Sequence, residues 1–487
     1  MAPRLLSKSR YLTGLQCLKY LWISFHEPRQ VSEPGTATQY VFDRGHLVGE
    51  LAKQVFPDGV NIPPDDFMGN IRQTREMLQQ RRTVFEAGIT AGKLYSRLDI
   101  LKPVNDDEWD IVEVKSSTRI KDVDIEDVAF QKYCCQQAGM GIRNCFLMHI
   151  NNKYVRRGEI DPGQLFIIED VTEQVADTMR SVPDKVGTML EVIAAEDCPD
   201  IVIGKQCSSP YECLVEGCRE FLPEDNVTEL YRGGQKSFEL LNDGILAICE
   251  IPDTFKLSGS QEIQKTCIST GQPYADGASI KSFLDSLQYP LYYLDFETFS
   301  AAVPPFDGTH PYQNIPFQFS LHVVAAAAAE PEHFSYLTSG TADPRPELLA
   351  ALKKWLGKSG SIIVYNQSFE KSVLADLAEA FPEYKNWVES ILSRFIDLLL
   401  PFRSFWYYHP AQKGSASLKA VMPALTGQGY QGLNIANGEN ASFEFYRVTY
   451  GDVPEEERER VRQDLEKYCG RDTEGMIWII RALQEIT

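Results

Sequence analysis

The first part of the chain mixes strand-like and helical patterns of apolar and polar side chains. In residues 94–101 (LYSRLDIL) and 109–117 (WDIVEVKSS) apolar and polar side chains alternate, which predicts two β-strands. Amphipathic helical segments surround these runs, so residues 1–222 are predicted to form one mixed α/β domain. Residues 223–288 are more polar and carry helical patterning, and we interpret them as a helical connector.

After the connector a new pattern begins. Strand-like runs at 290–299, 317–326 and 361–366 alternate with helical segments. The last helical pattern, 455–483, begins polar and ends in the apolar stretch MIWIIRAL, so one of its faces is expected to be buried. Strands that alternate with helices indicate a mixed sheet covered by helices, and hence a second α/β domain over residues 289–487.

The composition is that of a globular protein with an excess of negative charge. The 487 residues are 43% hydrophobic and 24% charged, which excludes a disordered or collagenous chain. With 68 Asp and Glu against 48 Lys and Arg the formal net charge is -20, which argues against indiscriminate coating of nucleic acid. The N-terminus lacks the apolar core of a signal peptide, and no run has the length and apolarity of a membrane span. We therefore predict a cytoplasmic protein without membrane association.

Carboxylates and a lysine gather on the two predicted strands of the first domain. Glu113 and Lys115 are two residues apart, so both side chains point to the same face, and Asp99 lies near the end of the preceding run. A carboxylate pair can hold a divalent cation, and a neighbouring lysine can orient water and stabilise charge on a phosphate. The alternative is a surface ion pair on an edge strand.

With flanking motifs, these residues give the segment its resemblance to the RecB-like branch of the PD-(D/E)XK nucleases, which have a restriction-endonuclease-like fold. The matching residues are His46 in FDRGHLVGELAK, Asp99 in RLDIL, Glu113 and Lys115 in EVKSS, and Gln131 and Tyr133 in DVAFQKYCCQQAG. The resemblance implies that His46, Asp99 and Glu113 bind Mg or Mn. It further implies that Lys115 serves the attacking water and that Gln131 and Tyr133 flank the site on the following helix.

Eleven cysteines in a cytoplasmic chain are expected to be mostly reduced, and three of them cluster in CSSPYECLVEGC. These are Cys207, Cys213 and Cys218, and Cys17 in LTGLQCLKYLW is the candidate for a fourth metal ligand. One cysteine before the nuclease core and three after it resembles the arrangement in the iron-sulfur nucleases of CRISPR adaptation and of the AddB recombination subunit. The resemblance implies a [4Fe-4S] cluster that joins the two ends of the domain. The alternatives are zinc and buried, inert thiols, and we interpret the other seven cysteines as buried and inert.

The second predicted domain carries a further set of carboxylates. Asp295 and Glu297 are two apart on one predicted strand and share a face, where two like charges are costly without a cation. Tyr468 and Asp472 are four apart on the last helix and also share a face. Between these segments, VYNQSFEKSVLADL places Glu370 near the start of a helix. The alternatives are a solvated carboxylate pair and a helix-capping glutamate.

The order D-x-E, then N-x-x-F-E, then Y-x-x-x-D resembles the DEDDy class of DnaQ-like 3'-5' exonucleases, which have a ribonuclease H-like fold. The resemblance implies that Asp295, Glu297 and Asp472 bind two Mg or Mn ions and act with Tyr468, which orients the attacking water. Glu370 departs from the pattern of this family, which normally has Asp at the corresponding position. Its longer side chain either reaches the second ion through a water molecule or shifts that ion and lowers the activity.

Together these features predict a fusion of two α/β nucleases, a restriction-endonuclease-like domain followed by a ribonuclease H-like domain. Each site is expected to hydrolyse phosphodiester bonds with Mg or Mn and without a covalent intermediate. The expected partner is nucleic acid, with DNA favoured over RNA, in DNA repair or defence. Residues 414–425 and His409 are expected to line the groove of the second site. The alternative is a nucleic-acid-binding or scaffold protein in which one or both sites no longer turn over.

Overall fold

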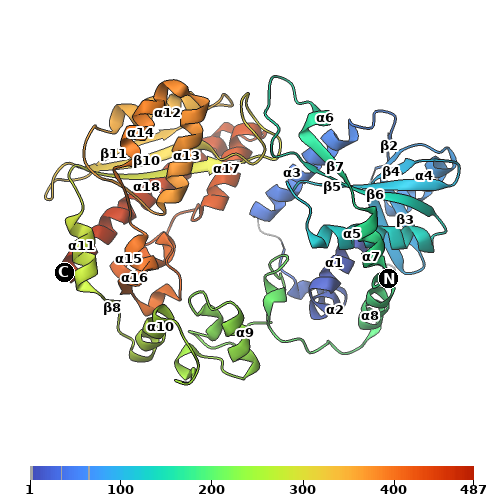
Figure 1. Cartoon of the computed structure of the whole chain (residues 1–487), viewed down its shortest axis with the longest axis horizontal. Helices are drawn as coiled ribbons and strands as arrows, with labels where there is room; N and C mark the ends of the chain where they lie inside the picture. Colours follow the sequence, from blue (N-terminus) through green and yellow to red (C-terminus); the bar gives the residue numbers. More distant parts are fainter. Residues whose placement is uncertain (1–3, 34–35, 64–65) are drawn as a thin grey trace. The chain divides into compact units, whose positions relative to one another are not determined.

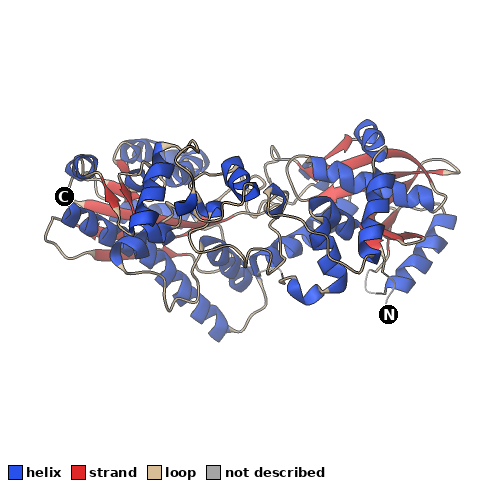
Figure 2. Cartoon of the chain, turned by 90° about the horizontal axis from the view of Figure 1, so that it is seen from below, coloured by secondary structure: helices blue, strands red, loops and turns tan. Residues whose placement is uncertain are grey.

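The computed structural model describes residues 4–33, 36–63 and 66–487, leaving aside the side chains of residues 36–44. In this part of the chain the strands form sheets of seven, five and two strands, with helices around them (Figure 1, Figure 2). The predicted mixed α/β class is confirmed. None of the helices in the described residues is both long enough and apolar enough to cross a membrane.

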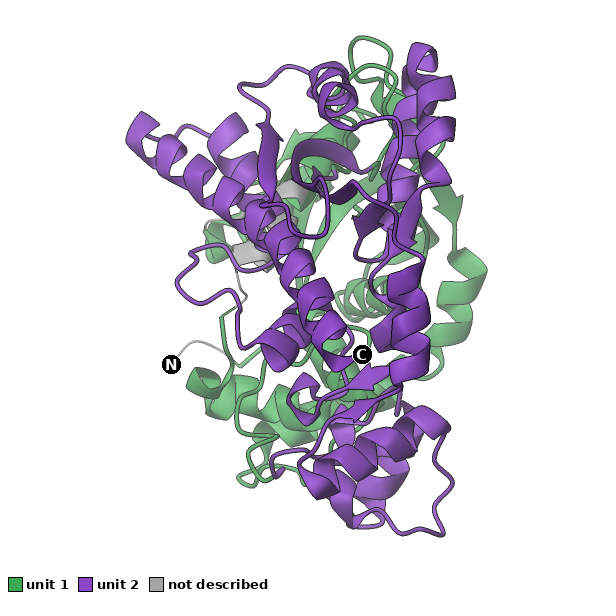
Figure 3. Ribbon diagram, turned by 90° about the vertical axis from the view of Figure 1, so that its left-hand side faces the viewer, with its two compact units in different colours: residues 1–221, 301–313 green, residues 222–300, 314–487 purple. Residues whose placement is uncertain are grey.

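The chain consists of two compact units (Figure 3). The first consists of residues 1–221 and 301–313, and the second of residues 222–300 and 314–487. The segment 301–313 is held in the first unit by Arg156, whose Nη1 donates to the carbonyl oxygens of Pro304 and Pro305 at 3.1 and 2.7 Å. The polar stretch 223–288, for which we predicted helices, forms helices within the second unit.

The first unit is built on the seven-stranded sheet, with strand order β2-β3-β4-β5-β6-β7 and β1 paired beside β4. The strands are β1 (Leu6–Ser7), β2 (Val60–Asn61), β3 (Val84–Ala91), β4 (Leu94–Pro103), β5 (Glu108–Lys115), β6 (Gly141–Ile150) and β7 (Phe166–Asp170). Strands β3, β4 and β5 are antiparallel, whereas β5 and β6 are parallel because a helix crosses over between them. The two predicted strands of this unit are β4 and β5.

Helices of the first unit enclose two separate hydrophobic cores. They are α1 (Lys8–Gln16), α2 (Leu18–His26), α3 (Thr36–Lys53), α4 (Phe67–Gln79), α5 (Asp122–Gln137), α6 (Pro162–Leu165), α7 (Thr172–Met179) and α8 (Val182–Ala194). The crossover helix α5 packs across the sheet and places Phe130 in one core with Leu98. Helix α3 packs against β5 and places Val48 in the other core with Val112. The sheet is therefore buried between these helices.

The second unit is built on the five-stranded sheet, with strand order β11-β10-β9-β12-β13. The strands are β9 (Leu291–Phe299), β10 (Ile315–Val324), β11 (Glu332–Leu337), β12 (Ile362–Val364) and β13 (Phe395–Asp397). The pairs β11-β10 and β10-β9 are antiparallel, and β9-β12 and β12-β13 are parallel. The short strands β8 (Tyr274–Ala275) and β14 (Tyr407–Tyr408) form the two-stranded sheet.

Side chains of β9 alternate between the two faces of the sheet, so successive residues pack against different helices of the second unit. These helices are α9 (Gln235–Asn242), α10 (Gly259–Thr270), α11 (Gly277–Asp285), α12 (Arg345–Trp355), α13 (Gln367–Ala380), α14 (Lys385–Leu392), α15 (Leu400–Arg403), α16 (Leu418–Thr426), α17 (Gly438–Tyr450) and α18 (Glu455–Ile486). Tyr292 and Leu294 pack in a core with α12 and α13, whereas Tyr293 packs in a core with α11 and α18. Asp295 and Glu297 continue the series of Tyr293, so strand packing fixes both carboxylates on the side of α18.

Candidate metal-binding sites

The second unit holds a compact group of potential metal ligands at its central strand. One carboxylate oxygen from each of Asp295 and Glu297 and the Sγ of Cys469 all lie within 4.8 Å of one another, the one such group among the described residues. The first two lie on β9, and Cys469 lies on α18 with its Sγ 3.6 Å from Oδ2 of Asp295. The sequence gives Cys469 no role beyond packing, and its position beside a carboxylate arises only from the docking of α18 on β9.

Asp472, one helical turn after Tyr468 on α18, lies beside this group, and its charge acts on Asp295 and Glu297. Its carboxylate accepts hydrogen bonds from the hydroxyls of Tyr430 and Tyr468. Burial raises the pKa of Asp472 to about 6, and these hydrogen bonds together with the charge of Lys419 keep it from rising further. Tyr430 lies between α16 and α17 in a loop without hydrophobic periodicity, so no pattern in the sequence marks it. Lys419 lies within residues 414–425, which were expected to line this site.

Burial, followed by the charge of Asp472, raises the pKa values of Asp295 and Glu297. Burial, followed by the charge of Asp472, raises the pKa of Glu297 to about 8. The pKa of Asp295 is raised well above its ordinary value by burial and then by its acidic neighbours, Glu370 among them. Lys419 is the basic neighbour, and its own pKa is lowered by burial. These buried groups have too little positive charge beside them to be ionised together, and a bound divalent cation would supply that charge.

Glu370, in the first turn of α13, is buried with 2% of its surface exposed. Burial, and then the charge of Asp397, raises its pKa to about 8. Within the described part of the chain its Oε2 has no hydrogen-bond partner. Asp397 instead accepts the backbone N–H of Asn366 at 3.0 Å, a bond that holds the turn into α13. A buried carboxylate oxygen without a partner is costly, and a ligand bound at this site would satisfy it.

The first unit brings together four of the residues expected in its site. Lys115 Nζ, at the end of β5, lies 2.9 Å from Glu113 Oε1, and Gln131 Nε2, on α5, donates to Glu113 Oε2 at 2.8 Å. Asp99, on β4, accepts the backbone N–H of Val114 at 2.8 Å through its Oδ2. Glu113 is buried with 2% of its surface exposed. These contacts join two neighbouring strands and the crossover helix.

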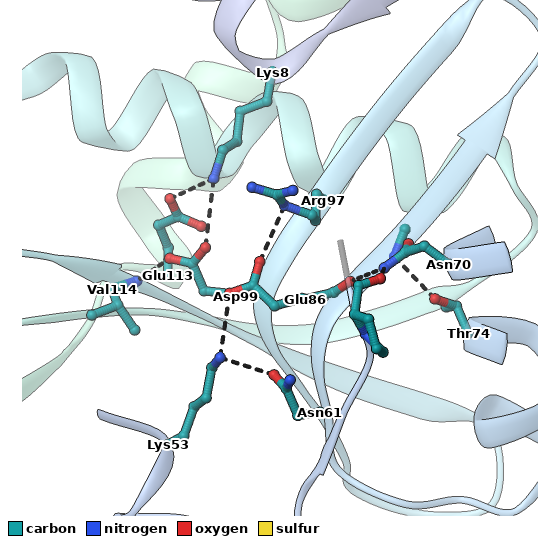
Figure 4. Close-up of polar contacts among 12 residues, drawn as sticks. Lys8, Lys53, Asn61, Asn70, Thr74, Glu86, Arg97, Asp99, Glu113 and Val114 are labelled. Atoms are coloured by element: carbon teal, nitrogen blue, oxygen red, sulfur yellow. Dashed lines mark hydrogen bonds and ion pairs between the residues drawn. The ribbon is translucent and has the colours of Figure 1, made fainter. Parts of the chain in front are cut away.

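Two further residues complete this cluster. Lys8, the first residue of α1, places its Nζ 2.7 Å from Glu113 Oε1 and 3.9 Å from Asp99 Oδ1 (Figure 4). Asp127, one turn before Gln131 on α5, accepts from Lys115 Nζ at 2.6 Å and from Gln131 Nε2 at 3.1 Å. The four-residue spacing of Asp127 and Gln131 is visible in the sequence and is a signal for this contact. For Lys8 the sequence holds no comparable signal.

The carboxyl groups of this cluster differ in pKa, because the lysines lie closer to Glu113 than to Asp99. Burial, followed by the charge of Glu113, raises the pKa of Asp99 to about 7. Burial also favours the neutral form of Glu113, but Lys115 and Lys8 outweigh it and hold the pKa of Glu113 below its ordinary value. The pKa of Lys115 is raised well above its ordinary value, because Glu113 and Asp127 outweigh the effect of burial. Glu113 is therefore ionised with two ammonium groups beside it.

Two predicted residues of the first site lie outside this bonded cluster. His46 is exposed on α3, and in the described structure no hydrogen bond or ion pair joins it to Asp99 or Glu113. Tyr133 is partly buried and packs against the hydrophobic core of the first unit. The contacts thus bring together Asp99, Glu113, Lys115 and Gln131 of the predicted set.

The four cysteines singled out in the sequence converge within the first unit. Cys17 separates α1 from α2, and Cys207, Cys213 and Cys218 lie in the segment after α8. The backbone N–H of Cys213 donates to the carbonyl oxygen of Cys207 at 2.9 Å. Burial raises the pKa of Cys213, and the other three sulfurs are near enough to raise it further. Residues from the two ends of the unit therefore meet at one place.

Gln16 joins these two segments directly. Its Nε2 donates to the carbonyl oxygens of Gln206 and Tyr211 at 2.8 and 2.7 Å. Among the described residues no three of the clustered sulfurs lie within 4.8 Å of one another, whereas the ligands of a tetrahedral zinc ion lie about 3.8 Å apart. The expectation that all other cysteines are buried is wrong for Cys198 and Cys249, which are exposed. Cys198 lies in the loop after α8, and Cys249 lies in the 3-10 helix Ile248–Glu250.

Part of the chain is similar to a protein family and to proteins of mycoplasmas and ureaplasmas. Residues 292–417 match the family model described as "Domain of unknown function (DUF2779)", a span that holds Asp295, Glu297 and Glu370. The chain is 27% identical over 224 residues to the uncharacterized MG366 homolog of Mycoplasma pneumoniae, which covers 42% of this chain and 34% of that protein. It is 25% identical over 232 residues to the uncharacterized MG366 of Mycoplasma genitalium, covering 44% and 35%. An uncharacterized protein of Ureaplasma parvum, UU173, is 26% identical over 207 residues, covering 38% and 30%. The alignments span about a third of the length of these relatives.

Proposed function

We propose that the protein is a metal-dependent nuclease that hydrolyses phosphodiester bonds of nucleic acid, DNA in preference to RNA. The observation that carries this proposal is the convergence of Asp295, Glu297 and Asp472 at the interface of β9 and α18, where burial, followed by the charge of Asp472, raises the pKa values of the other two carboxyls. Hard divalent cations such as Mg and Mn prefer oxygen ligands of this kind. The unpartnered Oε2 of Glu370 fits the same ligand set.

Each residue of the second site has a role in this proposal. Asp295, Glu297 and Asp472 would hold the cations, with Glu370 at the second of them. Bound divalent cations lower the pKa of water and neutralise charge on the phosphoryl oxygens. The hydroxyl of Tyr468, hydrogen-bonded to Asp472, orients the attacking water. This assignment corresponds to a DEDDy 3'-5' exonuclease on a ribonuclease H-like fold.

The first site is proposed to act in the same class of chemistry on a restriction-endonuclease-like fold. Asp99 and Glu113 would supply oxygen ligands to Mg or Mn. Lys115, fixed between Glu113 and Asp127, is placed to serve the attacking water, and Gln131 fixes the second oxygen of Glu113. The role of His46, which is exposed on α3, as a further metal ligand stays a prediction.

We also propose that Cys17, Cys207, Cys213 and Cys218 hold a [4Fe-4S] cluster. Four thiol donors suit such a cluster, and their spacing is wider than a single zinc ion requires. A cluster at this place would link the beginning and the end of the first unit and close a very long loop. Its role would therefore be structural.

A second candidate is a nucleic-acid-binding protein in which a site no longer turns over. For the first site, the observation that favours it is the contact of both Lys8 and Lys115 with Glu113, since these ammonium groups already compensate the carboxylate. For the second site it is Glu370, which replaces the expected Asp. Tests of cleavage at each site separate the two candidates.

The test uses end-labelled single- and double-stranded DNA and RNA, incubated with Mn²⁺ and the full-length protein. Asp99→Ala and Asp295→Ala are expected to abolish distinct cleavage activities, because each removes a proposed ligand of a different site. Asp253→Ala is the control, since Asp253 is an exposed carboxylate whose ion pair in the described structure is with Lys265, in the helical segment outside both sites. Unchanged cleavage by both ligand variants would contradict the proposal.

A further inference from the structure

Lys8 places a positive charge among the three carboxylates of the first site. Its Nζ lies 2.7 Å from Glu113 Oε1, 3.9 Å from Asp99 Oδ1 and 4.0 Å from Asp127 Oδ2. Figure 4 shows the side chain entering from α1, with its ammonium group pointing toward the carboxylates of Glu113 and Asp99. An ammonium group within reach of three carboxylates occupies the kind of position that a bound cation takes.

The position of Lys8 follows from the pairing of β1 with β4. Leu6 pairs with Leu94 and Ser7 with Tyr95, so the residue after β1 begins α1 at the edge of β4, the strand that carries Asp99. Ser7 caps α1 by accepting the backbone N–H of Arg10. Lys8 is thus held by secondary structure, and its location is built into the fold.

Two ammonium groups contact one carboxylate oxygen of Glu113 while Lys8 is present. Its Oε1 accepts from Lys8 and Lys115, and its Oε2 accepts from Gln131. Divalent cations bind carboxylate oxygens at about 2.0 to 2.6 Å, a distance that two ammonium groups on the same oxygen do not allow. A cation can therefore bind Oε1 of Glu113 only if one lysine leaves, whereas Oε2 accepts a single hydrogen bond, from Gln131.

Of the two lysines, Lys8 is the one free to leave. Lys115 makes two short contacts, 2.9 Å to Glu113 Oε1 and 2.6 Å to Asp127 Oδ2. Lys8 makes one short contact, at 2.7 Å, and two long ones, at 3.9 and 4.0 Å. Withdrawal of Lys8 toward solvent therefore loses fewer short contacts than withdrawal of Lys115.

We propose that Lys8 is a built-in competitor for the divalent cation of the first site. Its ammonium group holds Glu113, Asp99 and Asp127 together in the metal-free protein and withdraws when the cation binds. The affinity of this site for the cation is thus set by Lys8 as well as by the ligands. This inference rests on the proposed metal site at Asp99 and Glu113.

The test measures Mn²⁺ binding calorimetrically on the full-length chain, in a background of Asp295→Asn and Asp472→Asn that removes ligands of the second site. Lys8→Met is expected to bind Mn²⁺ about tenfold more tightly or better, because the competing charge is gone. Its melting temperature without metal is expected to fall and to be restored by Mn²⁺. Lys185→Met is the matched control, because Lys185 also forms an ion pair within the first unit, with Glu126, which lies outside the cluster.

The outcomes separate this inference from the proposed function. If Glu113→Gln abolishes Mn²⁺ binding and Lys8→Met does not strengthen it, the metal site stands and the competitor role of Lys8 is overturned. If neither the background protein nor Lys8→Met binds Mn²⁺, the first metal site fails and the role of Lys8 fails with it. Lys8→Gln, which keeps a hydrogen-bond donor to Glu113 without the charge, replaces Lys8→Met if the latter does not fold, with the same tighter binding expected.

Discussion

The Sγ of Cys469 lies 3.6 Å from Oδ2 of Asp295, so a thiol on α18 stands beside a carboxylate of the central strand. Burial, and then the charge of Asp295, raises the pKa of this thiol well above its ordinary value. A thiol that stays protonated donates weakly to the carboxylate and is a poor nucleophile. Cys469 therefore supports Asp295 as a neutral neighbour.

We expect iodoacetamide to leave Cys469 unmodified in the native protein while it alkylates Cys198 and Cys249, which are exposed. The physical reason is that alkylation requires an accessible thiolate. Mass mapping of peptides after timed labelling measures the modification, and the denatured protein is the control in which Cys469 must react. Native labelling of Cys469 as fast as that of Cys249 would contradict the prediction.

Replacing each of the two tyrosines that donate to Asp472, Tyr430 and Tyr468, is expected to change a different property of the second site. Tyr430→Phe removes a hydrogen bond that orients a proposed ligand, so we expect Mn²⁺ affinity at the second site to fall about tenfold or more. Tyr468→Phe removes the group proposed to orient water, so we expect kcat of the Asp295-dependent cleavage to fall about 100-fold, with a smaller loss of affinity. Calorimetry and steady-state kinetics measure the two effects. Tyr289→Phe, at an exposed position, is the control, and equal effects of all three changes would refute the assignment.

The second site illustrates what local patterns predict. The period of two in β9 places Asp295 and Glu297 on one face, and the spacing of Tyr468 and Asp472 places both on one side of α18. These relationships depend only on backbone geometry, so the sequence is enough to predict them. Tyr430 reaches Asp472 from a loop between two helices, and only the tertiary arrangement of α16, α17 and α18 brings it there.

In the first site, too, the sequence predicts the contacts set by local spacing but not those set by long-range pairing. Glu113 and Lys115 share a face of β5, as their spacing predicts, and Gln131 reaches Glu113 from the crossover helix. Lys8 arrives through the pairing of β1 with β4, residues far apart in the sequence, and a two-residue strand has no detectable periodicity. Contacts made by such long-range pairing were the part of both sites that the sequence did not reveal.

The proposed [4Fe-4S] cluster has consequences for the colour and the iron content of the purified protein. Anaerobically purified protein is expected to be brown and to contain about four iron atoms per chain. Cys207→Ser is expected to lower iron content and the melting temperature of the first unit, while the Asp295-dependent cleavage stays unchanged. Cys249→Ser, at an exposed thiol, is the control. Colourless, zinc-loaded protein with full activity would rule out the cluster.

A histidine pair gives the second unit a pH-dependent contribution to stability. His322 stacks on His333 with ring centroids 4.2 Å apart, and its Nδ1 lies 2.7 Å from Thr473 Oγ1. Burial, followed by the charge of His333, lowers the pKa of His322 from 6.5 to about 4. Between these values the folded state binds fewer protons than the unfolded state, so this contribution is full above pH 6.5 and is lost as the pH falls through about 4.

We therefore expect the free energy of unfolding of His322→Gln, relative to that of the unaltered protein, to increase as the pH falls from 6.5 toward 4, because the variant lacks the contribution that His322 loses over this range. Urea denaturation at a series of pH values measures the slope. His310→Gln, in a loop of the first unit, is the control and is expected to keep the slope of the unaltered protein. An unchanged slope in His322→Gln would show that other groups cause the pH dependence.

Gln131 bridges two buried carboxylates of the first site. Its Nε2 lies 2.8 Å from Glu113 Oε2 and 3.1 Å from Asp127 Oδ1, and its side chain is fully buried. Gln131→Met keeps a similar volume but removes the donor, so we expect the free energy of unfolding to fall by about 1 to 3 kcal/mol. The same change at Gln137, on the exposed end of α5, is the control and should alter stability by less than about 0.5 kcal/mol. Urea denaturation without metal measures both. Equal stability of Gln131→Met and the unaltered protein would mean that the lysines alone compensate Glu113, and the amide would then have no part in holding its carboxylate.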